Sequence, residues 1–163
     1  MQFHLETISR NDRESVIDIF NHYVEHSFAA YPESTVPYEF FEVLLQMAHG
    51  YPAVVAKDEH GRTIGFGMLR AHNPVATFSH TAEITYFISP VYTGRGIGTC
   101  ILEHLIEEGK KRGITSILAS ISSLNQGSIA FRKKHGFNTC GCFEGICKKK
   151  GRVFDVVWMQ RML

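Results

Sequence analysis

The chain has 163 residues, which is enough for a substantial buried core, and we expect a single domain over residues 1–163. Its 17 basic and 16 acidic residues leave a formal net charge of +1, which gives no reason to expect binding to nucleic acid or to an anionic membrane surface. There is no run of about 18 apolar residues, and the start of the chain lacks the basic and apolar regions of a secretion signal. We therefore expect a cytoplasmic protein with reduced cysteines.

The N-terminal part of the chain is predicted to form a strand and two helices. Residues 3–8 alternate like a strand, and Asn11 followed by Glu14 is typical of the capped start of a helix. Pro37 is typical of the first turn of a second helix, which Gly50 would end. The apolar positions at helical spacing are Val16, Ile19, Phe20, Tyr23 and Val24, then Phe40, Phe41, Leu44, Leu45 and Ala48.

The middle of the chain is predicted to form three strands. Residues 53–56 and 63–69 have strand character, and the composition of residues 58–61 indicates a hairpin turn between them. A loop over residues 72–80 then leads to a third strand over residues 82–88.

The C-terminal part is predicted to alternate between helices and strands. An amphipathic helix, a short apolar strand of the buried type, a short helix and a final strand pair follow one another. These elements cover residues 97–112, 117–121, 128–135, 138–147 and 153–162. The basic turn Lys148–Gly151 joins the last two strands, and we expect it to be a solvated hairpin tip.

Four cysteines raise the question of a metal site, because three of them lie near the C-terminus. The spacing of Cys140, Cys142 and Cys147 does not match the paired ligands of a zinc site. Strand alternation places Cys140 and Cys142 on one face, where small core residues would also fit. We therefore expect no metal.

The segment Thr93–Thr99 carries three alternate glycines between a strand and a helix. Glycines allow tight turns and close approach of a ligand, and the helix start offers free N–H groups to an anion. No lysine follows Gly98, which argues against a P-loop, and residues 117–123 contain no acid for a dinucleotide ribose. The remaining interpretations are an acyl-CoA loop or a glycine-rich helix start without a ligand.

Two motifs together resemble the GCN5-related N-acetyltransferase (GNAT) superfamily. Its acyl-CoA loop, Q/R-x-x-G-x-G/A, is similar to residues 93–98, although Thr93 replaces Gln or Arg. Its second CoA motif is similar to residues 125–131 followed by Gly136 and Phe137, and it lies one helix and one strand after the loop, as in that family.

Further segments resemble the phosphinothricin N-acetyltransferase-like branch, which includes amino-acid N-acyltransferases. These segments are residues 19–24, 50–56, 80–83 and 154–160. The resemblance implies an α/β (α+β) fold in which helices flank a twisted, mostly antiparallel sheet. In that fold the strand ending at Ile88 splays from the parallel strand at residues 117–121, and acyl-CoA lies in the gap.

The resemblance implies a set of contacts to acetyl-CoA. Backbone groups of Tyr86, Phe87 and Ile88 would bind the pantetheine arm, because a splayed edge has unpaired N–H and C=O groups. The pyrophosphate would lie against the glycine loop, and Asn125, Ser128 and Lys134 would contact the rest of the arm or the phosphates. The loop residues concerned are Gly94, Arg95, Gly96, Ile97, Gly98 and Thr99.

Glu83 is the main catalytic candidate. It is an acid in an otherwise apolar strand, a setting that favours the raised pKa of a general base. The branch has a glutamate at this place, and the alternative is an edge-strand salt bridge. The acceptor site is expected near the first helix, the loop after Ala29, the loop over residues 72–80 and the C-terminal hairpin. Candidates by place are Tyr31, Phe78, His80 and Arg152.

Arg132 stands where the family motif has a Tyr or His that could protonate the departing thiolate. Arginine cannot give up a proton at neutral pH, so we expect turnover without a discrete side-chain acid. Two roles remain open for Arg132 at this point, namely electrostatic stabilisation of the thiolate or a contact with a CoA phosphate.

These observations predict an acetyl-CoA-dependent N-acetyltransferase for a small amino acid or analogue, without a metal and with a homodimer as a possible assembly. Glu83 would take a proton from the amine directly or through water, and the amine would attack the thioester carbonyl. The alternatives are another acceptor, such as a polyamine, an aminoglycoside or a protein N-terminus, and a CoA-binding module without turnover.

Overall fold

The computed structural model describes all residues from 1 to 163 and contains one seven-stranded sheet with four α-helices. The strands are β1 (Phe3–Thr7), β2 (Ala53–Asp58), β3 (Thr63–Ala71), β4 (Thr81–Ile88), β5 (Ser116–Ser122), β6 (Asn138–Lys149) and β7 (Arg152–Met162). The helices are α1 (Arg13–His26), α2 (Phe40–Met47), α3 (Ile97–Lys111) and α4 (Gln126–Lys134). Their order and type agree with the elements predicted along the chain.

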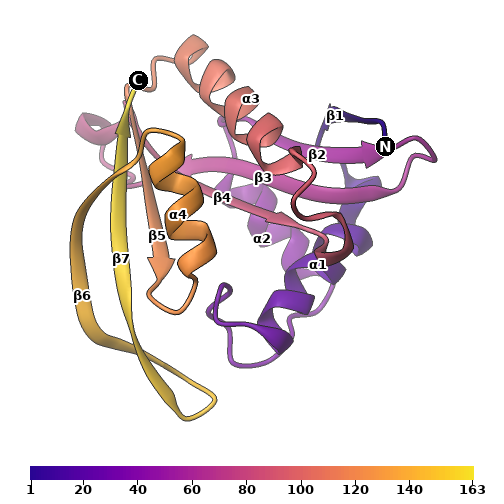
Figure 1. Ribbon diagram of the computed structural model, residues 1–163. Coiled ribbons are helices and arrows are strands. Elements are labelled where there is room, and N and C mark those ends of the chain that lie inside the picture. Colours follow the sequence, from indigo (N-terminus) through magenta and orange to yellow (C-terminus); the bar gives the residue numbers. More distant parts are fainter.

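The sheet order is β1-β2-β3-β4-β5-β7-β6, and all neighbours are antiparallel except β4 and β5. The parallel pairing is short, because it joins Thr81–Glu83 only to Ser116–Leu118. Beyond Glu83, β4 continues to Ile88 without a β5 partner, and the two strands diverge (Figure 1). The sheet is therefore split into two wings beyond this point.

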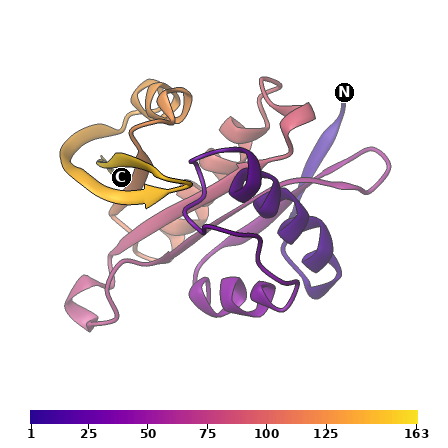
Figure 2. The same ribbon diagram turned by 90° about the horizontal axis from the view of Figure 1, so that it is seen from below.

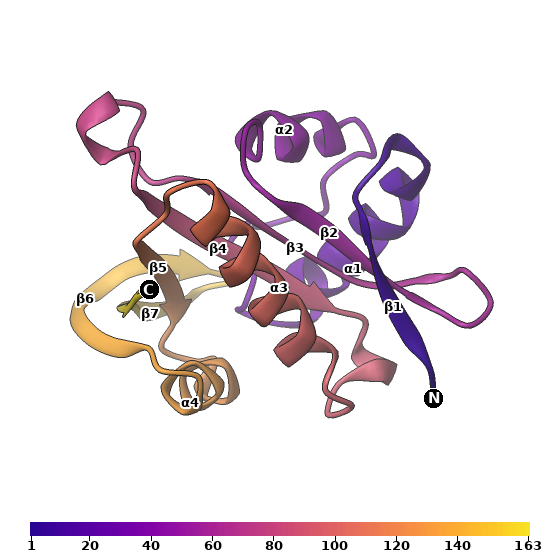
Figure 3. The same cartoon turned by 90° about the horizontal axis from the view of Figure 1, so that it is seen from above.

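Two apolar cores lie on the two faces of the sheet. One face packs against α3, with Ile101, Leu102 and Leu105 fully buried over β2–β5. The other face packs against α1 and α2, where Phe41 and Phe66 are buried. Figure 2 shows α1 and α2 on one side of the sheet, and Figure 3 shows α3 and α4 on the opposite side. Residues of β4 alternate between these cores, so one strand contributes side chains to both.

The start of α1 differs from the expectation. The backbone N–H of Ser9 donates to the Asp12 carboxylate at 2.9 Å, and α1 begins at Arg13. This pair caps a short 3-10 turn, Arg10–Asp12, and the N-cap of α1 itself is Asp12, one residue after the expected Asn11. The second helix also starts later than expected, at Phe40, after a turn that begins at Pro37.

The C-terminal hairpin corrects two further expectations. Cys140 and Cys142 are exposed, since their strand β6 is at the edge of the sheet and no helix covers it. Lys148, Lys150 and Gly151 are exposed, as expected for a solvated tip, but Lys149 is only 1% exposed. Its ammonium group donates to the carbonyl oxygens of Ser27 at 2.8 Å and Ala30 at 2.7 Å, in the loop after α1.

Candidate functional site

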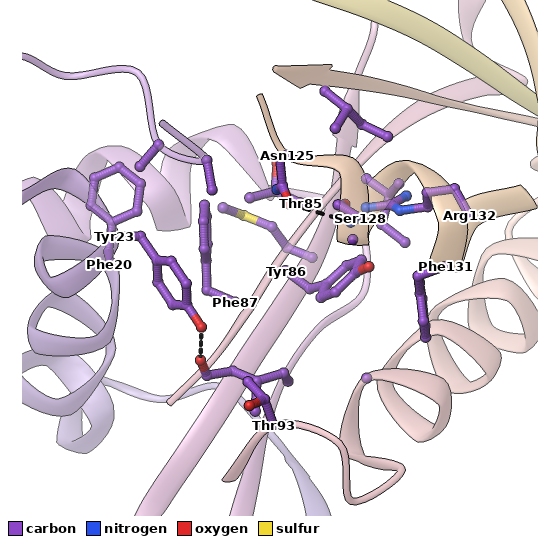
Figure 4. Close-up of a pocket in the computed structure, with 18 of the residues that line it drawn as sticks. Phe20, Tyr23, Thr85, Tyr86, Phe87, Thr93, Asn125, Ser128, Phe131 and Arg132 are labelled. Atoms are coloured by element: carbon purple, nitrogen blue, oxygen red, sulfur yellow. Dashed lines mark hydrogen bonds between the residues drawn. The ribbon is translucent and has the colours of Figure 1, made fainter. Parts of the chain in front are cut away.

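A cavity of about 960 Å³ crosses the sheet where β4 and β5 separate. On one side it is lined by the glycine loop, the start of α3 and α4. On the other side it is lined by α1, α2 and residues 29–32 of the loop between them. Figure 4 shows this arrangement, with Tyr86 and Phe131 on one side and Phe20 and Tyr23 on the other. Two molecules could therefore meet inside the sheet from opposite faces.

The glycine loop forms an open backbone cradle at the start of α3. Gly94 and Gly96 have φ values of +75° and +84°, and a Cβ built at either position would meet no atom within 4 Å. Side chains rarely adopt this conformation, so it favours glycine. Gly96 is the N-cap of α3, whose first N–H groups lack intrahelical partners and lie at the positive end of the helix dipole. The cradle fits an anion.

Most of the residues predicted for the loop line the cavity. They are Gly94, Gly96, Ile97, Gly98 and Thr99. Arg95 is outside the lining, where its guanidinium lies 5.4 Å from the centre of the Tyr92 ring.

The free edge of β4 brings Tyr86, Phe87 and Ile88 into the cavity lining. Beyond Glu83 this edge has no β5 partner for its backbone groups. The Tyr23 hydroxyl donates to the carbonyl oxygen of Ile88, which Figure 4 shows as a dashed line. Burial raises the pKa of Tyr23, so this donor keeps its proton at neutral pH. A ligand arm along β4 would thus find one carbonyl already engaged.

The first turn of α4 adds polar groups to the same wall. The Asn125 side-chain oxygen accepts from the Ser128 backbone N–H at 3.2 Å and caps the helix (Figure 4). The Asn125 amide NH₂ group is the part that remains for a ligand. Ser128 and the exposed Lys134 also line the cavity. The three residues predicted on this helix are therefore together on one side of the cavity.

Glu83 is buried in β4 between two basic side chains. Its carboxylate oxygens lie 3.2 Å from Arg70 Nη2 and 3.0 Å from His72 Nδ1. The carboxylate is thus surrounded by polar partners and not by the apolar surroundings expected from its strand. Glu83 itself does not line the cavity, but Arg70 and Thr85 do.

The four residues expected near the acceptor are dispersed. Tyr31 lines the cavity, and its hydroxyl is 3.5 Å from Ser120 Oγ. Phe78, His80 and Arg152 do not line it. Arg152 instead lies beside the Phe28 ring, 5.6 Å from its centre. The structure therefore brings one of the four to the site.

Several lining residues were not singled out from the sequence. Arg70 is the cation on the α1 side of the cavity, and it is opposite Glu83 in the β3–β4 register. Counting cross-strand positions from the predicted hairpin could have found it. The others include Phe20, Tyr23, Met68, Ser120 and His135, and no local motif marks them as site residues.

Two general findings concern metals and membranes. No three His, Cys, Asp or Glu side chains gather in a group that could hold a metal ion. None of the helices combines the length and the apolar character that a membrane crossing requires.

Comparisons with known proteins agree with this geometry. Residues 16–137 match the family described as Acetyltransferase (GNAT) family. The chain is 28% identical over 153 residues to an L-methionine sulfoximine/L-methionine sulfone acetyltransferase of Pseudomonas paraeruginosa. The aligned region covers 91% of this chain and 88% of that protein.

Two solved structures have the same fold and nearly the same length. A GNAT superfamily phosphinothricin acetyltransferase (Pat) from Sinorhizobium meliloti, in complex with AcCoA, has a TM-score of 0.93 and 29% identity, covering 100% of this chain and 89% of that one. A ribosomal-protein-alanine N-acetyltransferase from Brucella melitensis has a TM-score of 0.92 and 30% identity, covering 98% and 99%.

Proposed function

The chain belongs to the GNAT acetyltransferase family, and from this premise we propose that it transfers an acetyl group from acetyl-CoA to the primary amine of a small amino acid or analogue. The observation that carries the proposal is the cavity that crosses the sheet and opens toward both faces. One side offers an anion cradle and a free strand edge, and the other offers a space lined by α1, α2 and residues 29–32.

The residues of the first side fit acetyl-CoA. The N–H groups at Gly94–Thr99 suit the pyrophosphate, and the unpaired edge at Tyr86–Ile88 suits the amides of the pantetheine arm. Asn125 and Ser128 stand beside this path. When bound, acetyl-CoA supplies the thioester that is the acetyl donor.

We propose that Glu83 is the general base. Its carboxylate is near the cavity but outside its lining, so a water molecule would carry the proton from the amine to Glu83. Arg70 and His72 hold the carboxylate in place, 3.2 Å and 3.0 Å from its two oxygens. A backbone N–H of the free β4 edge could polarise the thioester carbonyl.

The lining favours a zwitterionic acceptor over a polycation. No Asp or Glu lines the cavity, and the Arg70 guanidinium, which pairs with Glu83 through Nη2, has further N–H donors on the acceptor side that suit a carboxylate. A polyamine or an aminoglycoside would find no anionic partner there. The names of the relatives, which act on amino-acid analogues, support the same class.

A panel of amines tests this function by release of the CoA thiol. We expect turnover of methionine sulfoximine, phosphinothricin or an ordinary amino acid to exceed that of spermidine or an aminoglycoside. A peptide beginning with alanine belongs in the panel, because one structural neighbour is named for that reaction. Faster turnover of the peptide or of a polycation than of every amino acid would overturn the acceptor class. Acetyl-CoA binding without turnover of any amine would indicate a CoA-binding module.

We further propose that the protein acts in the cytoplasm as a homodimer. The C-terminal hairpin exposes Phe143, Ile146 and Val153, each more than half accessible, and such a group of apolar side chains is typical of an interface. Light scattering on the purified protein measures its mass. A monomeric mass at all concentrations would contradict the homodimer but would not contradict the proposed acetyl transfer.

A further inference from the structure

Arg132 is a buried cation without an anionic partner. It is 4% exposed, and its Nε and Nη1 atoms have no hydrogen-bond acceptor. The guanidinium lies 4.5 Å from the centre of the Tyr86 ring and 5.2 Å from that of Phe137. A buried charge is normally paired, so an unpaired guanidinium in a cavity wall indicates a site for an anion.

The position of Arg132 places this anion beside the free edge of β4. Arg132 lines the cavity together with Tyr86 and Ser128, and Figure 4 shows its side chain reaching from α4 toward them. Tyr86 belongs to the part of β4 that has no β5 partner, along which the pantetheine arm is proposed to lie. The guanidinium is thus beside the proposed path of the arm.

A phosphate is a poor occupant for this position. The open cradle at Gly94 and Gly96 already suits the pyrophosphate and leaves it in contact with water. A phosphate beside Arg132 would be enclosed by two aromatic rings and would lose most of its hydration. A thiolate that forms at the end of the arm is already out of water, and a fixed cation stabilises it there without a proton transfer.

We propose that Arg132 binds the thiolate of CoA as it leaves, so that a permanent charge replaces a side-chain acid. This inference rests on the proposed acetyl transfer. The amine nitrogen forms a bond to the acetyl carbon, the carbon–sulfur bond breaks with its electron pair remaining on sulfur, and the proton of the amine passes through water to Glu83. Tyr86 is the titratable side chain that faces the guanidinium, and no carboxylate forms a salt bridge with it.

The thiol of bound CoA reports this contact without any turnover. We expect the ultraviolet absorbance of the thiolate to show that its pKa is lower when CoA is bound to the wild-type protein than when CoA is free. An opposite charge within about 4–6 Å lowers the pKa of an acid by roughly 1–3 units. In Arg132→Gln the acid dissociation constant of the bound thiol should fall at least tenfold, which raises its pKa by about 1 or more. Arg132→Lys should retain part of the lowered pKa.

Lys133→Gln is the matched control, because Lys133 is an exposed cation on the same helix that does not line the cavity. This variant should keep the full shift of the thiol pKa. If Arg132→Gln does not fold, the thiol pKa of CoA bound to the wild-type protein, compared with that of free CoA, still tests the proposal. Binding of CoA with an unshifted thiol, or an equal shift in Arg132→Gln, would overturn this inference alone. Absence of CoA binding by the wild type would overturn the proposed function as well.

Discussion

Glu83 is held on the face of β4 that also carries Thr85 and Phe87, opposite Arg70 in the neighbouring strand. Arg70 Nη2 lies at ion-pair distance from the carboxylate, 3.2 Å, and His72 Nδ1 lies 3.0 Å from its other oxygen. Contacts of this kind can stabilise the fold, or they can position a catalytic base. The location of Glu83 beside the cavity favours the second role. A substitution that keeps the shape and removes the charge separates these roles.

Glu83→Gln should lower kcat by about 10²- to 10⁴-fold, because the amine would lose its general base. The acidic limb of the pH–rate profile should change as well. Acetyl-CoA affinity, measured by calorimetry, should stay near the wild-type value, since Glu83 does not line the cavity. A variant with wild-type kcat at every pH would show that Glu83 only supports the structure.

Gly96→Glu should weaken acetyl-CoA binding by about 10- to 100-fold, because it adds strain and a negative charge where the pyrophosphate is proposed to bind. Gly113→Glu is the matched control. Gly113 has a similar φ of +82° and the same open surroundings, but it lies at the far end of α3, outside the cavity. Equal affinity of Gly96→Glu and the wild type in a calorimetric titration would contradict the cradle.

At the scale of elements, the C-terminal hairpin holds the loop that closes the acceptor side of the cavity. Lys149 donates to the carbonyl oxygens of Ser27 and Ala30, and the Lys150 backbone N–H donates to Glu33 at 2.8 Å. Residues 29–32 of this loop line the cavity. The hairpin therefore positions part of the acceptor site from a distant segment of the chain.

Lys149→Met should lower the free energy of unfolding by about 1–3 kcal/mol, because buried carbonyl oxygens would lose their donor. It should also raise the KM for the amine and leave acetyl-CoA affinity unchanged. Lys148→Met, at an exposed neighbour, should change stability by less than about 0.5 kcal/mol. Equal amine KM values in the two variants would show that the hairpin does not position the acceptor site.

The contribution of Lys149 to stability should depend on pH. Burial lowers the pKa of Lys149, so the unfolded chain holds this proton more tightly than the folded chain does. Its contribution to stability should therefore rise as pH increases from the lowered value toward the ordinary value of about 10.4. In denaturant titrations, the stability of the wild type relative to Lys149→Met should increase over this alkaline range, and a constant difference would contradict the prediction.

In the molecule as a whole, the cavity lies between the two halves of the split sheet, and residues of both apolar cores line it. The short β4–β5 pairing, which ends at Glu83 and Leu118, connects the wings on the closed side. A ligand that contacts β4 on one wing and α4 on the other would add connections across the split. Its binding should therefore be visible in the stability of the entire fold.

Acetyl-CoA at about 100 times its Kd should stabilise the protein by roughly 2.7 kcal/mol through mass action. For a chain of this size, this corresponds to a rise in Tm of about 5–10 °C. Gly96→Glu should show little of this rise at the same acetyl-CoA concentration. An unchanged Tm of the wild type in a thermal denaturation scan would contradict binding.

Much of the fold could be predicted from the sequence because it depends on local interactions. The amphipathic spacing of α3, the turn that ends at Gly61 and the glycines at residues 94–98 act over a few neighbouring residues. The start of α1 was misplaced by one residue because a 3-10 turn capped by Ser9 and Asp12 precedes it, and the spacing of Asn11 and Glu14 does not distinguish the two starts. Local patterns thus predict the presence of an element better than its ends.

The order of the elements, the glycine-rich loop and the family resemblance could be recognised without a structure, because each depends on short contiguous segments. The burial of Lys149, the pairing of Arg70 with Glu83 and the exposure of Cys140 are visible only in the folded chain. These properties depend on segments far apart in the chain, such as Lys149 and Ala30. Burial and charge pairing are set by what packs against a residue, and a single sequence does not state its neighbours in space.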